Sequence, residues 1–394
     1  MAAPRSIVVA GGGLAATRTV ERLRAHHIAG PITMVCAEPH VPYDRPPLSK
    51  EVLRGERDDT SLRVDWNDLE LEFRTGCRAV AVHADERTVL LDDGAEIPFD
   101  ALVIATGAEP HTVPSIYGSG AHVLRTIEDS RTLASDIRRD GQLAIVGGGF
   151  IGCEVAASAR ALGVEVTLVE LLKAPLARVL GTQVAAEVAD MHEAAGVHLL
   201  CGISVVEARG EGADRELLLS DGRTIEAPVV LASVGVHPAT EWLDGSGIEV
   251  DDGVLCGPTG RTSVPGVWAA GDVARWEHPL YGAHIRLEHW TSAVEQAGAV
   301  ARDIAGQPTP RLDVPYFWSD QYGVKFQMLG LPHPEDEVTL HRVGPAGDRM
   351  LALYGRDGRI SGALGVSVPK WVMRMRPLLM QRASYADALA AAQA

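Results

Sequence analysis

The stretch that decides the fold is QLAIVGGGFIGCEVAASARALGVEVTLVE, residues 142–170. It opens with a short apolar run, breaks into three glycines, continues with a helix-compatible segment to Leu162 and closes with a second apolar run that ends at Glu170. A strand that turns through glycines into a helix, followed by a strand with an acidic end, is the pattern of a nucleotide-binding βαβ unit. We therefore predict strands at 142–146 and 165–169 with a helix between them.

The same pattern opens the chain. An apolar run at 6–10 leads into glycines at 11–13 and a helix-compatible segment that ends near His26. A second apolar run at 32–37 then precedes Glu38. We predict a second βαβ unit here.

The repetition extends beyond the glycines. TVLLDDGAEIPFDALVIATGAEP at 88–110 aligns without gaps to ELLLSDGRTIEAPVVLASVGVHP at 216–238. Each copy predicts a short hairpin that turns at Asp-Gly, followed by a buried strand. A duplicated pattern at matching places implies two nucleotide-binding domains of one design.

Each residue of the first loop has its own task. Gly11 permits a tight turn, Gly13 lets the backbone approach a pyrophosphate, and Ala16 stands where helix and strand pack closely. The start of the following helix presents N–H groups and a positive dipole end to phosphate. Glu38 lies 22 residues beyond Ala16, a spacing that suits a carboxylate accepting hydrogen bonds from ribose hydroxyls. For this loop alone, an ordinary strand-to-helix turn is the alternative.

The second loop fills all three motif positions with glycine, at 147, 149 and 152. Glu170 follows 18 residues after the last of them. A carboxylate there would bond the free 2′-hydroxyl of NADH and repel the 2′-phosphate of NADPH, so NADH is favoured. Lys173 and Arg178 are near enough in sequence to reach a phosphate; the alternative is that both are solvated surface charges.

A third element is SVPGVWAAGDVAR at 263–275. A short strand at 267–270 should deliver Gly271 and Asp272 to the start of a helix. An acidic side chain there suits polyol hydroxyls better than phosphate, although it would also serve as an ordinary helix cap. Beside two dinucleotide loops, it indicates the ribityl chain of a flavin.

Size and composition bound the other possibilities. With 394 residues, of which 46% are hydrophobic, the chain should form two or three domains. Its net charge of −16 argues against nucleic-acid binding, which needs a basic surface. Because no apolar stretch approaches ~20 residues and the N-terminus lacks a signal pattern, we expect no membrane span and a soluble, cytoplasmic protein.

The cysteines and histidines indicate no metal site and no disulfide scaffold. The five cysteines stand at 36, 77, 153, 201 and 256. They form neither a CxxC pair nor a paired metal-ligand spacing, so we expect reduced, mostly buried thiols. His278, His284 and His289 are near one another in sequence, and we expect them to cap helices or lie at the surface.

Further motifs carry a family resemblance over residues 5 to about 385: YDRPPLSK at 43–50, Thr106-Gly107, and PYFWSDQYG at 315–323. The chain resembles the oxygenase-coupled, NADH-dependent ferredoxin reductases, relatives of rubredoxin reductase and apoptosis-inducing factor. The resemblance implies an α/β fold with two Rossmann-like domains of the glutathione-reductase type and a smaller α+β interface domain. The implied domains are FAD-binding (1–108 and 233–310), NADH-binding (109–232) and C-terminal (311–394).

The resemblance also assigns site residues. FAD contacts are expected from Ala15, Glu38, Lys50, Ala79, Arg125, Asp272 and Trp290. Adjoining cofactor contacts are expected from Gly11, Gly13, Leu14, Arg45, Ala105, Thr106, Gly107, Gly271, Glu288 and His289. NADH contacts are expected from Gly149, Ile151, Glu154, Glu170 and Gly235, with Gly147 and Phe150 beside them.

Lys50 and Glu154 are the pair that the resemblance places in catalysis. The lysine is expected near flavin N5, paired with the glutamate, where a cation would stabilise the anionic reduced flavin. A helix-surface lysine is the alternative for Lys50. By the same resemblance, the helix that begins near His289 should point its N-terminus at the pyrimidine end of the flavin.

The implied reaction is hydride transfer from NADH to a tightly but non-covalently bound FAD, then two single-electron transfers to a small acidic iron–sulfur ferredoxin. The ferredoxin would feed an oxygenase, such as a cytochrome monooxygenase. An NADH oxidase that makes peroxide and a redox sensor resembling apoptosis-inducing factor are the alternatives. The loop at 44–50 contains no cysteine, unlike that of single-cysteine relatives. We expect a monomer or a weak homodimer.

The C-terminal segment differs in charge from the rest. From Arg311 onward the sequence has ten Lys and Arg against eight Asp and Glu, within a chain of net charge −16. PKWVMRMRPLLMQR at 369–382 carries four basic residues and no acidic one. We expect a basic helix that steers an acidic ferredoxin; the alternative is a solvated surface element.

Overall fold

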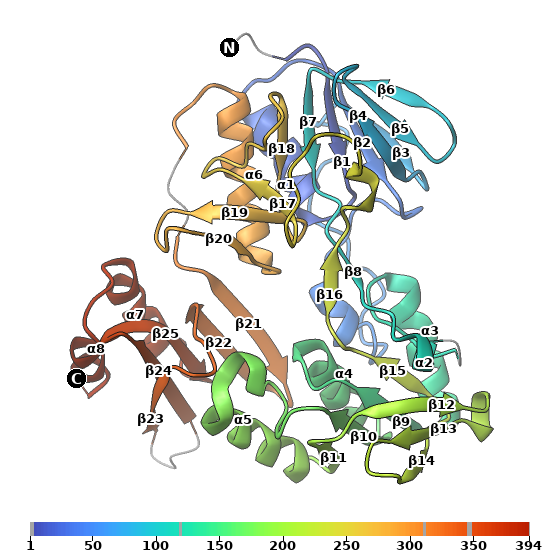
Figure 1. The fold of residues 1–394 in the computed structure, drawn as a ribbon, viewed down its shortest axis with the longest axis vertical. Helices are drawn as coiled ribbons and strands as arrows, with labels where there is room; N and C mark the ends of the chain where they lie inside the picture. Colours follow the sequence, from blue (N-terminus) through green and yellow to red (C-terminus); the bar gives the residue numbers. More distant parts are fainter. Residues whose placement is uncertain (1–3, 118–119, 310–312, 345–348, 394) are drawn as a thin grey trace. The chain divides into compact units, whose positions relative to one another are not determined.

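The computed structural model describes residues 4–117, 120–309, 313–344 and 349–393. The chain forms two compact units (Figure 1). The first comprises Met1–Asp44, Thr60–Glu109 and His237–Pro315, and the second comprises Arg45–Asp59, Pro110–Val236 and Tyr316–Ala394. The domain boundaries implied by the resemblance remain predictions, and the one at Arg311 lies outside the described residues.

The first unit is built on a five-stranded parallel sheet, in the order β18-β7-β1-β2-β3. Its strands are β1 (Ile7–Ala10), β2 (Ile32–Cys36), β3 (Leu71–Thr75), β7 (Ala101–Ile104) and β18 (Val267–Ala269). Every residue of β1 and β7 is buried, as expected for central strands covered on both faces. Helices α1 (Leu14–Ala25) and α6 (Trp290–Ile304) lie side by side (Figure 1).

Two small sheets complete the first unit. One is antiparallel and contains β4 (Ala79–His83), β5 (Thr88–Leu91) and β6 (Glu96–Pro98). The other contains β17 (Val254–Cys256), β19 (Ala274–His278) and β20 (Ala283–Arg286). Both sheets and the parallel sheet contribute side chains to one hydrophobic core.

The second unit repeats the design. Its parallel sheet has the order β11-β10-β9-β15, with β9 (Gln142–Val146), β10 (Glu165–Glu170), β11 (Val197–Cys201) and β15 (Val230–Ala232). The antiparallel sheet beside it has β12 (Val205–Arg209), β13 (Glu216–Leu219) and β14 (Thr224–Glu226). The helices are α2 (Pro114–Tyr117), α3 (Ile127–Asp140), α4 (Phe150–Ala161) and α5 (Ala177–Ala194). The chain passes from one unit to the other within β8 (Ala108–Pro110) and β16 (Val236–Pro238), and also after Asp44, Asp59 and Pro315.

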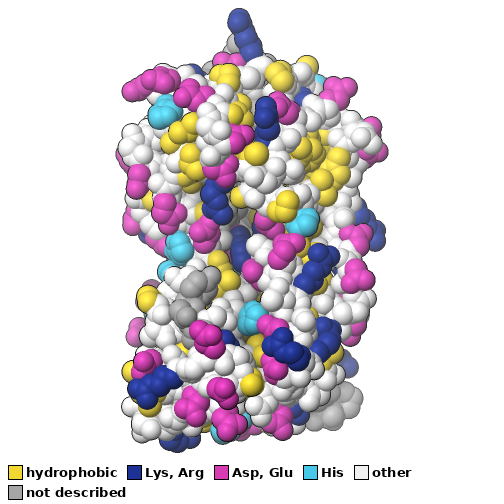
Figure 2. All heavy atoms as spheres, turned by 90° about the vertical axis from the view of Figure 1, so that its right-hand side faces the viewer, with side chains coloured by type: hydrophobic (Ala, Val, Ile, Leu, Met, Phe, Trp, Pro, Cys, Tyr) yellow, Lys and Arg dark blue, Asp and Glu magenta, His cyan; other side chains and the backbone are white. Residues whose placement is uncertain are grey.

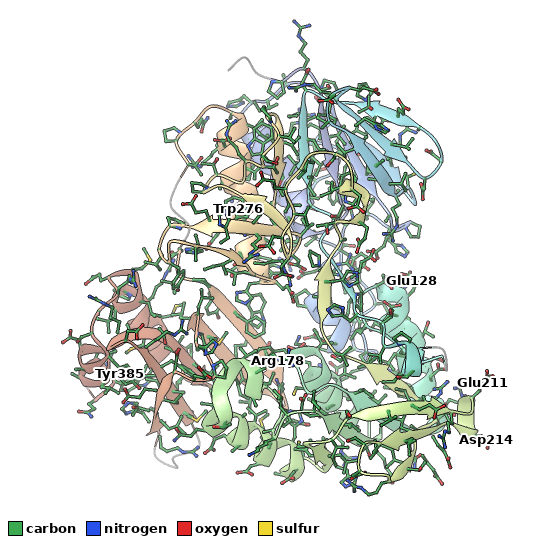
Figure 3. All side chains as sticks on the ribbon, in the orientation of Figure 1. Glu128, Arg178, Glu211, Asp214, Trp276 and Tyr385 are labelled. Atoms are coloured by element: carbon green, nitrogen blue, oxygen red, sulfur yellow. The ribbon has the colours of Figure 1, made fainter. Side chains whose placement is uncertain are left out.

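The second unit also contains an antiparallel sheet in the order β21-β22-β25-β24-β23. Its strands are β21 (Tyr316–Gln321), β22 (Val324–Gly330), β23 (Glu337–Val343), β24 (Arg349–Arg356) and β25 (Arg359–Val366). Two helices follow the last strand along the chain, α7 (Pro369–Met380) and α8 (Tyr385–Gln393). Tyr385, labelled in Figure 3, donates to the carbonyl of Leu353 at 2.9 Å. A Cβ on Gly355 would lie 2.7 Å from the Tyr385 ring, so only glycine leaves room for this contact.

The duplicated elements appear as predicted. The strands expected at 142–146 and 165–169 are β9 and β10. The hairpins expected at the two Asp-Gly turns are β5-β6 and β13-β14, each followed by a fully buried strand, β7 or β15. The predicted fold class is confirmed.

The described helices include none that is both long and apolar enough to cross a membrane. On the face shown in Figure 2, Asp and Glu side chains are scattered among Lys, Arg and uncharged side chains.

Candidate functional site

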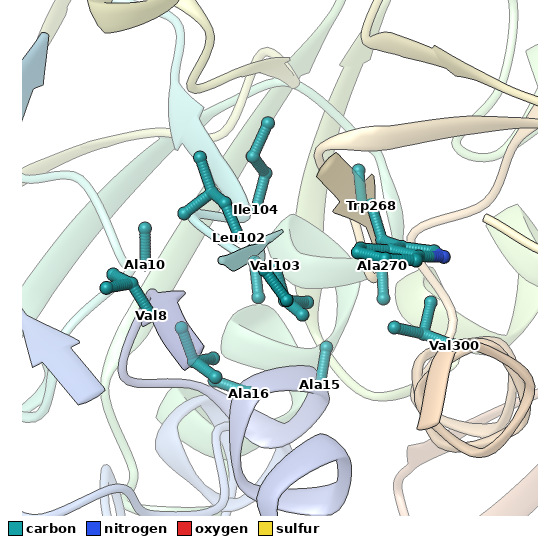
Figure 4. Close-up of a cluster of buried hydrophobic side chains, with 14 of the residues drawn as sticks. Val8, Ala10, Ala15, Ala16, Leu102, Val103, Ile104, Trp268, Ala270 and Val300 are labelled. Carbon is teal, nitrogen blue, oxygen red and sulfur yellow. The ribbon is translucent and has the colours of Figure 1, made fainter. Parts of the chain in front are cut away.

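The first glycine loop joins β1 to α1. Gly11 has φ of +138°, and a Cβ on it would lie 2.1 Å from the carbonyl oxygen of Ala105, so the position accepts only glycine. No atom lies within 4 Å of where a Cβ on Gly13 would stand, and α1 has no side-chain cap. Open space before an uncapped helix N-terminus suits a diphosphate. Ala16 is fully buried where the helix meets the sheet (Figure 4).

The Gly271-Asp272 segment lies against this loop. A Cβ on Gly271, whose φ is +82°, would come within 2.9 Å of the Ala15 Cβ in the first turn of α1. The predicted helix start at Asp272 is wrong, because the Ala274 N–H donates to the Gly271 carbonyl and closes a turn into β19. Asp272 therefore does not cap a helix. Burial lowers the pKa of His289 to about 4, and the Asp272 carboxylate opposes this shift.

Two predicted site residues, Glu38 and Trp290, form hydrogen bonds with Tyr43 and Asp44, for which no role was predicted. The Trp290 Nε1–H donates to Asp44 Oδ1 at 2.9 Å, and Tyr43 donates its hydroxyl proton to Glu38. Tyr43 and Asp44 belong to YDRPPLSK, a motif whose only signal in the sequence is the family resemblance.

The other first-unit residues assigned to the cofactors have ordinary local roles. The predicted start of a helix near His289 is confirmed, because His289 is the N-cap of α6. Thr106 donates to the Ala239 carbonyl at 2.8 Å, and Glu288 accepts from Arg286 at 2.6 Å. Ala79 and Ala105 are buried, Leu14 begins α1, and Gly107 has a positive φ.

The second loop repeats this geometry in the second unit. Gly147 has φ of +104°, and its Cβ would lie 2.3 Å from the carbonyl oxygen of Ser233. A Cβ on Gly152 would lie 2.2 Å from the Gly147 carbonyl oxygen, so the third motif glycine is required for close packing. Gly149 again faces open space, and α4 has no side-chain cap.

Glu170 is already tied to the loop. Its Oε2 accepts from the Gly148 N–H at 2.6 Å, and its Oε1 accepts from the Leu172 N–H at 2.7 Å. A carboxylate has about four acceptor positions, so two remain for a ribose diol. Leu171, next to it, is 62% exposed.

Other second-unit residues near this loop are exposed as well. Ile151 and Val234 are also exposed hydrophobic residues. Lys173 and Arg178 (labelled in Figure 3) are both exposed.

Lys50 and Glu154 form a buried ion pair in the second unit. The Lys50 Nζ lies 2.6 Å from Glu154 Oε2, and the two residues are 8% and 4% exposed. Lys50 is therefore not a surface lysine. Ser49 donates to the same carboxylate oxygen at 2.6 Å, and Ser319 donates to Oε1 at 2.7 Å. Neither serine was among the predicted site residues.

The remaining predicted site residues also lie in the second unit. Arg45 donates to the Arg125 carbonyl at 2.5 Å. Phe150 packs on Phe317 with ring centroids 4.4 Å apart. Gly235 has φ of +103°. The structure thus places Arg45, Lys50 and Arg125 in the unit that carries the second loop, whereas the other assigned FAD contacts belong to the first.

The cysteines have the features of inert thiols. Burial raises the pKa of Cys36 and of Cys256 to about 12, and burial followed by the Glu154 charge raises the pKa of Cys153 further. Cys77 and Cys201 are half-buried, and all five cysteines are free. In the part of the chain that the structure describes, no three His, Cys, Asp or Glu side chains are grouped to hold a metal ion.

Comparison with known proteins agrees with this geometry. Residues 5–297 match the family model for pyridine nucleotide-disulphide oxidoreductases, and residues 316–394 match that for a reductase C-terminal domain. The chain is 36% identical, over 94% of its length and 93% of the relative's, to the ferredoxin–NAD(+) reductase component of the anthranilate 1,2-dioxygenase system of Burkholderia cepacia.

Two solved structures are similar over the whole chain. One is the covalent putidaredoxin reductase–putidaredoxin complex, at 29% identity and a TM-score of 0.91, covering 99% of each chain. The other is the ferredoxin reductase for the CYP199A2 system from Rhodopseudomonas palustris, at 31% identity and a TM-score of 0.90, covering 99% of this chain and 100% of that one. The two open, uncapped glycine loops fit FAD and NAD(H), the cofactors of this family. The chain belongs to the pyridine nucleotide-disulphide oxidoreductase family.

Proposed function

We propose that the chain is an NADH-dependent reductase that passes electrons through FAD to a small iron–sulfur ferredoxin of an oxygenase system. The observation that carries this proposal is the pair of equivalent glycine loops, one in each unit, in a chain similar over its whole length to ferredoxin reductases. FAD, when bound, accepts a hydride and releases electrons singly, so the protein needs no nucleophile or metal of its own.

The first unit is proposed to hold FAD. The space before Gly13 takes the diphosphate on the N-terminus of α1, and Glu38 takes ribose hydroxyls. Asp272 accepts from the ribityl chain at the turn that rests on α1. The N-terminus of α6, where His289 supplies no side-chain cap, favours negative charge on the reduced ring.

The second unit is proposed to hold NADH and to supply the Lys50–Glu154 ion pair, which stabilises the anionic reduced flavin. Gly149 leaves room for the diphosphate, and Glu170 has two acceptor positions left for the adenosine ribose. Leu171 offers an exposed apolar surface to the adenine. The Lys50 ammonium, held by Glu154, is the cation proposed to lie near flavin N5.

We expect Glu170→Gln to lower the preference for NADH over NADPH by between about tenfold and a hundredfold, since one charge-assisted hydrogen bond contributes ~1.5–3 kcal/mol. The amide keeps one oxygen for the loop but removes the charge that repels a 2′-phosphate. Steady-state kcat/KM for both nucleotides measures the ratio.

Glu170→Arg should behave differently. It leaves the N–H groups of Gly148 and Leu172 without their acceptor, so NADH efficiency should fall more than NADPH efficiency rises. An unchanged ratio in Glu170→Gln would mean that this carboxylate does not set the preference.

The acidic ferredoxin is proposed to dock on α7. Lys370, Arg374, Arg376 and, just beyond the helix, Arg382 are all exposed. Arg374 stacks 4.8 Å over the Trp371 ring. Met373 is exposed, whereas Met375 is buried against the sheet, so the apolar side of the helix is only partly available. Complementary charge mainly raises the association rate and is screened beyond ~8–10 Å at physiological salt.

Reversing Arg374 and Arg376 to Glu should slow ferredoxin reduction about tenfold at low ionic strength and flatten its salt dependence. Ferricyanide reduction, which needs no docking, should change little. The matched control reverses Arg209 and Arg223, exposed residues on β12 and beside β14 that carry the same charge. Equal salt curves for the two double variants would place the docking surface elsewhere.

A comparison of electron acceptors distinguishes the proposed ferredoxin reductase from the alternative function, an NADH oxidase. NADH consumption in air is compared with and without a purified ferredoxin, and peroxide is assayed in both. With cytochrome c present as the final one-electron acceptor, the proposal expects ferredoxin to accelerate turnover severalfold, with two cytochrome c molecules reduced for each NADH and no increase in peroxide. Turnover that depends only on oxygen would favour the oxidase. We further propose a cytoplasmic location, where NADH is available and free thiols persist, and a monomer or weak homodimer.

A further inference from the structure

A chain of polar side chains continues from Glu154 into the C-terminal sheet and on to α5. The Ser319 hydroxyl donates to Glu154 Oε1 at 2.7 Å and accepts from Gln321 Nε2 at 3.1 Å. Gln321 Oε1 lies 3.1 Å from His192 Nε2, and the Tyr322 hydroxyl oxygen lies 2.7 Å from His192 Nδ1. Ser319, Gln321 and His192 are completely buried.

The chemistry of these groups gives the chain one direction. A carboxylate only accepts, so the Ser319 proton points to Glu154 and the serine oxygen accepts from the Gln321 amide. The Gln321 oxygen then accepts from the His192 Nε2–H, which leaves Nδ1 to accept from Tyr322. Burial lowers the pKa of His192 to about 4, so the ring is neutral at neutral pH, as this pattern requires. All four donors point toward Glu154.

Such an arrangement stabilises the charge at its end. Hydrogen bonds aligned head to tail polarise one another, and the last bond, to a carboxylate, is charge-assisted. The chain occupies Oε1 of Glu154, so Oε2 is left to Lys50 and Ser49. The groups that contact the Glu154 carboxylate are the Lys50 ammonium and the two serine hydroxyls. The Cys153 thiol on α4 lies near enough for the Glu154 charge to raise its pKa, after burial.

We propose that Ser319, Gln321, His192 and Tyr322 are positioning residues that hold the Glu154 carboxylate in one orientation, and through it place the Lys50 ammonium for flavin reduction. This rests on the proposed role of Lys50 and Glu154. It links Lys50, in the YDRPPLSK loop, to His192 on α5, a residue that is not assigned a contact with either cofactor.

The test uses the full-length, FAD-loaded protein with Ser319→Ala. The carboxylate then loses the hydrogen bond that fixes its Oε1, so the limiting rate of flavin reduction should fall while the Kd for NADH is unchanged. The rate constant at neutral pH should fall about tenfold, as expected for one hydrogen bond to a charged group. Tyr322→Phe, which removes only the far donor, should lower the rate constant by less.

Ser361→Ala is the matched control. Ser361, on β25 of the same sheet, donates to Asp336 at 2.6 Å, so this variant loses an equivalent serine–carboxylate bond outside the network. Its rate constant of flavin reduction and its Kd for NADH should match those of the wild type. If Ser319→Ala also matches the wild type, the network is only structural and the proposal is overturned.

Two further measurements separate the possible failures. If Lys50→Met slows reduction and Ser319→Ala does not, the network proposal alone fails; if neither variant changes it, the proposed role of Lys50 fails as well. Nitrogen-15 NMR of histidine-labelled protein, which does not depend on turnover, should show His192 as the Nε2–H tautomer, with an Nδ1 shift that moves in Tyr322→Phe. An Nδ1–H tautomer would reverse the direction of the chain and overturn the proposal.

Discussion

Gly11→Ala is expected to yield folded protein that has lost its FAD, whereas Gly147→Ala should keep FAD and lose its reaction with NADH. The two changes are equivalent, because each forces a side chain into a positive φ and against a backbone carbonyl oxygen, at 2.1 Å and 2.3 Å. The unfavourable φ alone costs ~1–2 kcal/mol. The backbone must also move at the point that receives a diphosphate, so we expect affinity to fall at least about a hundredfold.

The flavin-to-protein absorbance ratio after gel filtration measures the first effect, and NADH titration of flavin reduction measures the second. Gly94→Ala and Gly222→Ala are matched controls, one in each unit. Both glycines have a positive φ, but no atom lies within 4 Å of the position that a Cβ would take, so these variants should lose a little stability and keep both cofactors. If Gly11→Ala retains FAD and Gly147→Ala loses it, the two loops have been assigned to the wrong cofactors.

Lys50→Met should have the second large effect. Removing one partner of a buried ion pair leaves an uncompensated charge and typically costs ~3–5 kcal/mol of stability. The variant should also be reduced by NADH much more slowly, because the ammonium proposed to stabilise the reduced flavin is gone. Denaturant unfolding and anaerobic stopped-flow reduction measure the two effects.

The double variant Lys50→Met with Glu154→Leu separates stability from chemistry. Replacing both charges with apolar side chains removes the unpaired carboxylate, so much of the stability should return. The slow reduction should persist, because the ammonium is still absent. Recovery of the reduction rate together with stability would show that the pair acts only on the fold.

Local pattern was enough to predict the strands, the loops and the duplication. Alternating turns and apolar runs determine β9, β10 and the two Asp-Gly hairpins within stretches of about 30 residues. The turn at Asp272 was mispredicted, because an apolar run followed by Gly-Asp is compatible with either a helix or a strand after it. In the structure the Gly271 carbonyl accepts from the Ala274 N–H, which closes a turn and leads into a strand instead of a helix. The local sequence pattern does not encode this hydrogen bond.

The polar surroundings of Glu154 could not be derived from the residues in this way. Ser49 and Ser319 lie 105 and 165 positions away from it in the sequence. Hydrogen bonds between such distant segments have no local periodicity, and a buried serine cannot be told from a surface serine by residue type. The motif PYFWSDQYG identified the segment as unusual through the resemblance but did not show which of its side chains reaches Glu154.

The most direct measurement of the proposed function is the reoxidation of the NADH-reduced protein by a purified ferredoxin. The flavoprotein is reduced with one equivalent of NADH without oxygen and mixed in a stopped-flow instrument with an oxidised [2Fe–2S] ferredoxin from a panel that includes putidaredoxin. The account predicts that for at least one ferredoxin the flavin is reoxidised as two equivalents of ferredoxin are reduced, at a rate that saturates with ferredoxin and falls with salt. If no ferredoxin of the panel reoxidises the flavin faster than the protein alone in buffer, while oxygen does so rapidly, the central claim is contradicted.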